Sequence, residues 1–332
     1  MPADPRRDAV LERLDPELAR ALADFPLEVD PGDYFDDPEV LRMLRSSPDI
    51  LAMSGAPPAT DGRVVAENRM VDGPTGPGAL GLRIYRPTAA TSALPAVVFS
   101  HGGAFIIGNP YQDEHRCRTF AAEAECVVVS VDWRHAPEHP FPAGVEDAYG
   151  AFVWTVSHAG ELGVDEDRVA VGGASSGGAF AAASALMARD RGAPMPVMQV
   201  LVYPVIDDRQ DTPSMLEFDA APLWTRGATA RMWELYLGPG GGEANPYAAP
   251  GRATDLGGLP PAYVMAAELD PLRDEAIAYA RRLLQAGVPT ELHCFAGACH
   301  GFDTVAPTTA LARRAITEQV GALRRGFAAR RS

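Results

Sequence analysis

The segment Gly173-Ala174-Ser175-Ser176-Gly177 has the spacing G-x-S-x-G, which suits a nucleophilic serine. A serine hydroxyl is a weak nucleophile, so it must face a base and a substrate at the same time. A sharp strand-to-helix turn exposes it, and small flanking residues allow the crowded backbone to make that turn. The helix N-terminus adds positive potential near the oxygen that becomes negative in acyl transfer. Ser175 has a glycine two residues before it and another two residues after it, so we predict it as the nucleophile. Ser176 would be the nucleophile if the motif were shifted by one residue.

A second glycine-containing segment, His101-Gly102-Gly103-Ala104-Phe105, follows a strand-like run upstream of the serine turn. Backbone N–H groups aimed at the negative oxygen of an acyl-transfer intermediate each stabilise it by roughly 3–4 kcal/mol. Glycine lets the backbone approach closely enough to do so. We predict Gly102 and Gly103 as donors, with the N–H of Ser176 as the third. Taken alone, the segment is nearly as well explained as a tight turn without a catalytic role.

Two residues downstream could complete the chemistry. Asp270 follows a strand-like run, where open parallel sheets place active groups, and His300 comes 30 residues later. The chain order serine, acid, histidine is that of α/β-hydrolases. We expect His300 to take the Ser175 proton and return it to the leaving alcohol, while Asp270 orients the imidazole. Asp270 could instead cap a helix, and Asp274 is a competing acid, although it falls inside a predicted helix.

The other histidines are at the wrong points in this order, and we interpret them as structural. His135 and His139 have a metal-like i, i+4 spacing, but Pro137 and Pro140 oppose a helix there. No metal site is therefore predicted.

The rest of the chain alternates strand and helix patterns, which predicts an α/β fold with a mostly parallel sheet and helices on both faces. The predicted strands are short, rich in valine and apolar on both faces. They span Leu80–Tyr85, Ala96–Ser100, Cys126–Asp132, Arg168–Gly173, Val197–Tyr203, Ala262–Ala267 and Thr290–Phe295. The predicted helices span Asp113–Ala124, Ala143–Ser157, Ser176–Arg191, Arg273–Ala286 and Thr308–Arg325.

Two segments depart from this alternation. Residues 1–60 are polar and helical, with apolar residues at helical spacing. Residues 207–237 contain several large apolar side chains without a strand pattern, and the glycine-rich run 238–242 follows them. We interpret both segments as parts of one helical cap. The predicted organisation is a cap at 1–60 and 207–247 and a core at 61–206 and 248–332.

Composition narrows the class of partner. The 332 residues carry a formal charge of −15, which repels phosphate backbones and argues against nucleic-acid binding. No stretch is long and apolar enough to span a membrane, and no signal core is visible, so a cytoplasmic location is the default expectation. The four cysteines form no C-x-x-C pair and are expected to be reduced thiols.

Taken together, the motifs resemble the microbial branch of the hormone-sensitive-lipase-like carboxylesterase family, which belongs to the α/β-hydrolase superfamily. That family carries H-G-G-G, Y-R-L-A-P-E, G-D-S-A-G-G, D-P-L-x-D and H-G-F in this order. The matching segments here are His101–Phe105, Trp133–Ala143, Gly173–Gly178, Asp270–Asp274 and His300–Phe302.

The resemblance implies an α/β-hydrolase core with a helical cap, and hydrolysis of short to medium acyl esters of small molecules without a cofactor. It is also compatible with a homodimer. From the expected position of the cap, we predict that Phe105, Tyr203, Leu223, Trp224 and Phe302 line the substrate pocket.

Three positions differ from the family pattern, and they bear on the substrate range. Ala104 replaces the third glycine, Ala174 replaces an aspartate and Ser176 replaces an alanine. The same triad would also serve an amide, carbamate or lactone hydrolase. A ligand-binding protein on this scaffold is a further alternative, which the presence of His300 disfavours.

Overall fold

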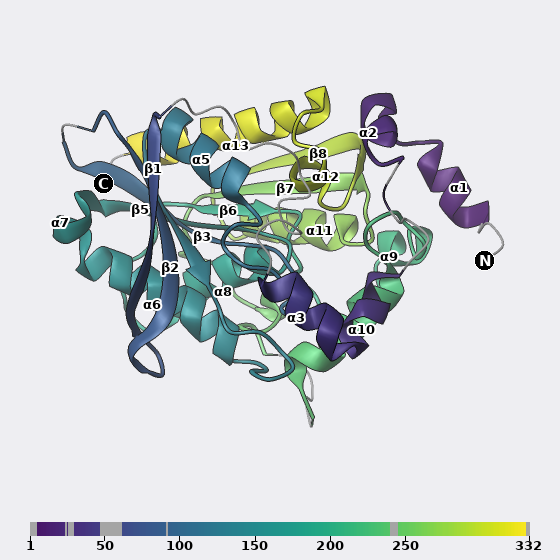
Figure 1. The fold of residues 1–332 in the computed structure, drawn as a ribbon, viewed down its shortest axis with the longest axis horizontal. Coiled ribbons are helices and arrows are strands. Elements are labelled where there is room, and N and C mark those ends of the chain that lie inside the picture. Colours follow the sequence, from purple (N-terminus) through teal and green to yellow (C-terminus); the bar gives the residue numbers. More distant parts are fainter. Residues whose placement is uncertain are drawn as a thin grey trace.

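A computed structural model describes residues 5–23, 25, 30–46, 62–90, 92–239 and 245–329. Within these ranges eight strands form one sheet in the order β1-β2-β4-β3-β5-β6-β7-β8 (Figure 1). β2 pairs antiparallel with β1 and β4, and the strands from β4 to β8 are all parallel. The strands are β1 Val64–Gly73, β2 Gly76–Pro87, β3 Leu94–Ser100, β4 Val127–Asp132, β5 Val164–Ala174, β6 Gln199–Val202, β7 Ala262–Leu269 and β8 Thr290–Cys299.

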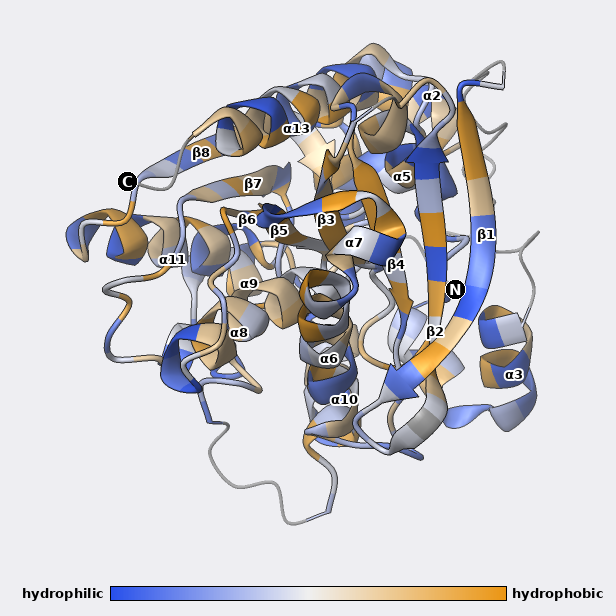
Figure 2. Cartoon of the chain, turned by 90° about the vertical axis from the view of Figure 1, so that its left-hand side faces the viewer, coloured by the Kyte–Doolittle hydropathy of each residue, from blue (hydrophilic) through white to orange (hydrophobic). Residues whose placement is uncertain are grey.

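Helices cover both faces of this sheet (Figure 2). Successive strand residues point to opposite faces, so Val97 and Phe99 of β3 enter one core while Ala96 and Val98 enter the other. Figure 2 shows α5 and α13 on one side of the sheet, and α6, α8 and α11 on the other. The predicted mostly parallel sheet with helices on both faces is therefore confirmed.

Five helices of the core lie close to their predicted positions: α5 Glu114–Glu123, α6 Ala143–Ser157, α8 Ser176–Asp190, α11 Arg273–Gln285 and α13 Ala310–Ala328. The short helices α7 Ala159–Leu162 and α12 Phe302–Val305 and the 3-10 helix η2 Pro250–Arg252 were not predicted. The prediction for α13 was wrong at its start, because the Thr309 hydroxyl accepts a hydrogen bond from the N–H of Ala312 and caps the helix there.

Several strand predictions need correction. β2 begins at Gly76 and β5 at Val164, each four residues before its predicted start. β1 was not predicted, because it is an edge strand with polar residues such as Glu67 and Arg69 at its centre and few buried positions. β8 was predicted to end at Phe295, but it continues through Gly297 to Cys299. Its extension carries the chain directly to His300.

The N-terminal segment and the mid-chain insertion are helical, as predicted. They contain α1 Pro5–Leu11, α2 Pro16–Ala21, η1 Pro31–Asp36, α3 Pro38–Ser46, α9 Pro213–Glu217 and α10 Arg226–Leu237. Four apolar side chains of this segment are buried in the core on the α13 side of the sheet: Val10 of α1, Leu14 in the turn after it, Leu18 of α2 and Leu22 at the end of α2.

The N-terminal segment is also joined to the insertion. η1 packs against α10, and the Thr225 hydroxyl donates a hydrogen bond of 2.8 Å to the Asp30 carboxylate. Phe35 of η1 contacts Trp224, with ring centroids 6.4 Å apart. The predicted end of the N-terminal segment near residue 60 and most of the glycine-rich run at 238–242 lie outside the described residues. No helix in the described ranges has the length and apolar character needed to cross a membrane.

Candidate active site

Ser175 lies at the turn between β5 and α8, with φ 55° and ψ −119°. The flanking glycines make this turn sterically feasible. A Cβ atom on Gly173 would overlap the carbonyl oxygen of Gly177, and one on Gly177 would overlap that of Ser100. The carbonyl of Ser175 accepts from the N–H of Val205, at 3.1 Å, so the turn is also held by hydrogen bonding. The hydroxyl is therefore presented at the end of a strand in a conformation that its neighbours fix.

His300 joins Ser175 to Asp270. Its Nε2 lies 2.9 Å from Ser175 Oγ, and its Nδ1 lies 2.7 Å from Asp270 Oδ2. Asp270 is fully buried at the end of β7, and its second oxygen accepts from the N–H of Leu272 at 2.9 Å. The ends of the parallel strands β5, β7 and β8 meet at one edge of the sheet, which brings three residues far apart in the chain into one hydrogen-bonded line.

Ser176 and Asp274, the competing candidates for the nucleophile and the acid, make other contacts. The Ser176 hydroxyl is buried and has no hydrogen-bond partner within the described part of the chain. Asp274 pairs with Arg273 at 2.8 Å and accepts from the N–H of Ser214 at 2.9 Å. Neither makes a hydrogen bond to His300, so the geometry favours Ser175 over Ser176 and Asp270 over Asp274.

The predicted oxyanion loop, residues 101–105, lies beside Ser175. A Cβ on Gly102 would lie 3.5 Å from the Cβ of Ser175, and Gly103 has a φ of +126° that favours glycine.

Four N–H groups of this region lack a protein acceptor. Across the described ranges, no protein group accepts a hydrogen bond from the N–H of Gly102, Gly103, Ala104 or Ser176. Ala104, which was not predicted as a donor, has a left-handed backbone with φ 57°. Its identity as alanine hid this conformation in the sequence, because glycine is the usual signal of such a position.

Known proteins resemble this chain over most of its length. Residues 97–304 match the profile of a family described as alpha/beta hydrolase fold. Esterase LipI of Mycobacterium tuberculosis is 39% identical to this chain over 315 residues, which cover 94% of each protein. The chain belongs to the hormone-sensitive-lipase-like carboxylesterase family. The carboxylesterase NlhH of the same organism is 36% identical over 320 residues, covering 95% of this chain and 96% of the relative.

A solved structure extends this similarity to three dimensions. A bacterial heroin esterase matches with a TM-score of 0.87 at 40% identity, covering 96% of this chain and 99% of its own. The predicted α/β-hydrolase fold is confirmed, and so is the prediction that the chain is a hydrolase of the carboxylesterase type.

The five residues predicted to line the substrate pocket divide into three groups by their surroundings. Tyr203 and Trp224 flank His300, with ring centroids 4.8 and 5.8 Å from the imidazole. Leu223, next to Trp224, is partly buried. Phe105 instead stacks on Tyr236 inside one core, with centroids 3.8 Å apart, and Phe302 is fully buried in the other core.

Sequence reasoning missed a buried charge network behind His300. Arg116 is 2% exposed and lies between the carboxylates of Asp113 and Asp303. No motif marked these residues, because their proximity depends on the fold and because a charged residue in a helix ordinarily suggests an exposed surface.

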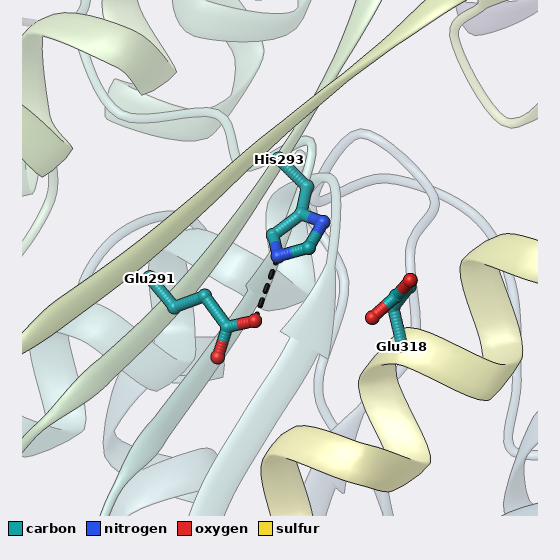
Figure 3. A group of neighbouring side chains, drawn as sticks. All are labelled: Glu291, His293 and Glu318. Carbon is teal, nitrogen blue, oxygen red and sulfur yellow. Dashed lines mark hydrogen bonds and ion pairs between the residues drawn. The ribbon is translucent and has the colours of Figure 1, made fainter.

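A group of side chains with metal-binding chemistry lies elsewhere. Glu291 and His293 of β8 and Glu318 of α13 each offer a ligand atom within 4.8 Å of the others (Figure 3). However, His293 Nε2 already pairs with Glu291 at 2.7 Å, and Arg325 pairs with the same glutamate at 2.5 Å. The guanidinium opposes a cation there, and the group lies at the end of β8 away from His300, so it has no part in the site.

Proposed function

We propose that this protein hydrolyses carboxylic esters with Ser175 as nucleophile, His300 as general base and Asp270 as its partner. The observation that carries the proposal is the pair of hydrogen bonds at His300, one to Ser175 Oγ at 2.9 Å and one to Asp270 at 2.7 Å. This is the relation that nucleophilic acyl transfer requires, because the base must reach the hydroxyl while a third group holds the imidazole in the correct tautomer.

In the first half of the reaction, Ser175 Oγ attacks the ester carbonyl carbon as His300 Nε2 takes its proton. The carbonyl oxygen becomes negative, and the imidazolium is stabilised by the Asp270 carboxylate. His300 then gives the proton to the leaving alcohol, and the acyl group remains on Ser175. In the second half, a water molecule replaces the alcohol, loses its proton to His300 and releases the acid.

We propose Gly102, Gly103 and Ser176 as the donors to the oxyanion, with Ala104 as a further candidate. The N–H groups of all four residues have no protein acceptor in the described part of the chain. The N–H of Ser176 also belongs to the first turn of α8, where the helix dipole favours negative charge.

The substrate class follows from the family and from the surroundings of His300. The relatives LipI and NlhH are named as an esterase and a carboxylesterase. We propose neutral esters with short to medium acyl chains, bound beneath a cap made of residues 1–60 and 207–247. Tyr203 and Trp224 supply apolar surface beside the base, and the charge of −15 favours uncharged or cationic substrates.

The test is turnover of p-nitrophenyl acetate, butyrate and octanoate by the purified protein and by Ser175→Ala. We expect Ser175→Ala to remain folded and to lose roughly 10⁴-fold or more of kcat. Ser176→Ala is the matched control, because it removes the neighbouring hydroxyl but keeps the backbone donor. Wild-type turnover in Ser175→Ala would reject the assignment, and cleavage of p-nitroanilides in preference to esters would reject the substrate class.

A further inference from the structure

The acid and the base of the proposed triad follow neighbouring strands. Asp270 comes directly after β7 and His300 directly after β8, and these two strands pair in parallel. The position of the base relative to the acid therefore depends on how the two strand ends are aligned. Acyl transfer tolerates little error in that alignment, because a misplacement of about 1 Å can cost roughly 100-fold in rate.

The pairing of β7 with β8 is irregular just before these residues. Ala267 lies opposite Phe295, but Leu269 lies opposite Cys299. The three residues 296–298 of β8 therefore face the single residue Glu268, and we call these three residues the β8 bulge. Bulges bend a strand and occur beside active sites, where they redirect a side chain. Here the bulge lies immediately before the segment that carries His300.

The side chain of Glu268 contacts the middle of this bulge. Its Oε2 accepts a hydrogen bond from the N–H of Gly297 at 2.8 Å. Gly297 has a φ of +70°, which favours glycine and takes the backbone out of the regular strand conformation. An extra residue in a bulge loses its partner in the strand ladder, and the carboxylate supplies one. The contact joins the residue two before Asp270 to the residue three before His300.

The N-terminal segment contacts the same bulge. The carbonyl oxygen of Gly297 accepts from the N–H of Asp15 at 2.9 Å, and the Asp15 side chain caps α2. Arg13 Nη2 lies 3.1 Å from Glu268 Oε1, the carboxylate oxygen that does not bind Gly297. Both backbone groups of Gly297 are therefore engaged, one by Glu268 and the other by the N-terminal segment.

Glu268 belongs to the more firmly held of the two strands. β7 lies between β6 and β8, whereas β8 is the last strand of the described sheet. The carbonyl oxygen of Glu268 also accepts from Arg273 Nη1 at 3.1 Å, and the next residue, Leu269, is fully buried. Because the bulge is on the edge strand, the interior strand fixes its position rather than the reverse.

We propose that Glu268 is a positioning residue, whose carboxylate fixes the β8 bulge at Gly297 and thereby sets the place of His300 relative to Asp270 and Ser175. The inference rests on the proposed function of these three residues. Glu268 makes no hydrogen bond to any of them within the described part of the chain. Its loss should therefore lower the rate of the chemical step and leave substrate binding nearly unchanged.

The test compares Glu268→Met with Glu268→Gln in the full chain. Glu268→Met keeps the length of the side chain but removes both oxygens, whereas Glu268→Gln keeps an oxygen that can accept from the Gly297 N–H and removes only the charge. We expect kcat for p-nitrophenyl butyrate to fall about 10- to 100-fold in Glu268→Met and less than about threefold in Glu268→Gln, with KM within about twofold of wild type. Labelling of Ser175 by a fluorophosphonate should slow in parallel with kcat.

Glu291→Met is the matched control. Glu291 is a glutamate of similar exposure on the same pair of strands, at the end of β8 away from His300. It pairs with His293 at 2.7 Å and with Arg325 at 2.5 Å. We expect its loss to lower thermal stability by a similar amount but to leave kcat and the labelling rate unchanged.

The outcomes separate a positioning role from a merely structural one. Wild-type kcat in Glu268→Met would overturn the proposal, and so would equal losses of kcat in Glu268→Met and Glu268→Gln, because the charge would then matter rather than the acceptor for Gly297. If Glu268→Met does not fold, Glu268→Asp decides, since it keeps the charge but is too short to reach Gly297 and should lower kcat below that of Glu268→Gln. Wild-type protein that is not labelled at Ser175 would instead reject the proposed function itself.

Discussion

Ser175 adopts a backbone conformation that a residue with a side chain seldom occupies, with φ 55°. Such conformations cost about 1–3 kcal/mol and persist only where the surroundings enforce them. Here the enforcement comes from close backbone contact, which leaves no room for side chains at Gly173 and Gly177. The same glycines that allowed Ser175 to be predicted from the sequence are thus the ones that hold it in position.

Gly177→Ala tests this steric explanation. The added methyl group would overlap the carbonyl oxygens of Ser100 and His101, so β3 and the turn must move apart. We expect a loss of about 1–3 kcal/mol in the free energy of unfolding by urea, together with a large loss of esterase activity. Gly160→Ala is the control, because nothing lies within 4 Å of the added atom there. Equal stability of the two variants would contradict the explanation.

The oxyanion donors show where prediction from residue types ends. Gly103 was predicted from its type, and its φ of +126° explains the glycine. Gly102 was predicted on the same ground, and its N–H likewise has no protein acceptor in the described part of the chain. Ala104 was passed over because an alanine gives no sign of a left-handed backbone. Which N–H groups are free depends on contacts that spacing alone does not reveal.

At the scale of elements, the N-terminal segment and the mid-chain insertion are held together by a small number of polar contacts. The Thr225 hydroxyl caps α10 by accepting from the N–H of Ala228 at 3.0 Å, and it donates to Asp30 at 2.8 Å. Asp30 also accepts from the N–H of Gly32, at the start of η1. One side chain therefore both begins α10 and ties it to η1.

Thr225→Val keeps the volume of this side chain but removes both hydrogen bonds. We expect a loss of about 1–3 kcal/mol in unfolding free energy and a raised KM for p-nitrophenyl butyrate, because Trp224 beside it would be less well held against His300. Thr212→Val is the control: Thr212 caps α9, with its hydroxyl 3.4 Å from the N–H of Met215, but does not bind the N-terminal segment. A KM unaltered in both variants would argue against a link between this contact and the substrate site.

Elements differed in how well their sequences revealed them. The parallel strands were found because burial on both faces makes them continuous apolar runs. β1 was missed because it is exposed along most of its length, so its sequence has few apolar residues to mark a strand. It is a strand because it pairs with β2 along its length. The start of α13 was misjudged because Thr308 and Thr309 are the same residue type and could cap the helix equally well. The structure shows that Thr309 is the cap.

At the scale of the whole molecule, the fold brings together groups that no local pattern connects. Arg116 and Asp303 are far apart in the chain, and they meet because α5 and α12 both lie on the α13 side of the sheet. Burial at this scale also changes titration. His101 is fully buried against Trp133, and desolvation lowers its pKa to about 3.

This lowered pKa predicts a loss of stability in acid. In the unfolded chain His101 takes up a proton as the pH falls below about 6.5, whereas in the folded protein it stays neutral until the pH nears 3. The unfolded state therefore binds more protons in this window, and stability falls with pH, by roughly 2 kcal/mol between pH 7 and pH 5 from this group. Urea unfolding at the two pH values measures the difference.

His101→Gln should make that difference smaller by the same amount, while His139→Gln, at an exposed position, serves as the control. An unchanged pH dependence in His101→Gln would show that other groups account for the acid sensitivity.

The central claim, that Ser175 is the activated nucleophile of this carboxylesterase-family protein, is tested most directly by covalent labelling. The protein is treated with a fluorophosphonate, and the modified peptide is located by mass spectrometry. We predict a single adduct on Ser175 that is absent from Ser175→Ala and retained in Ser176→Ala. An adduct on Ser176, or full labelling of Ser175→Ala at another residue, would contradict the account.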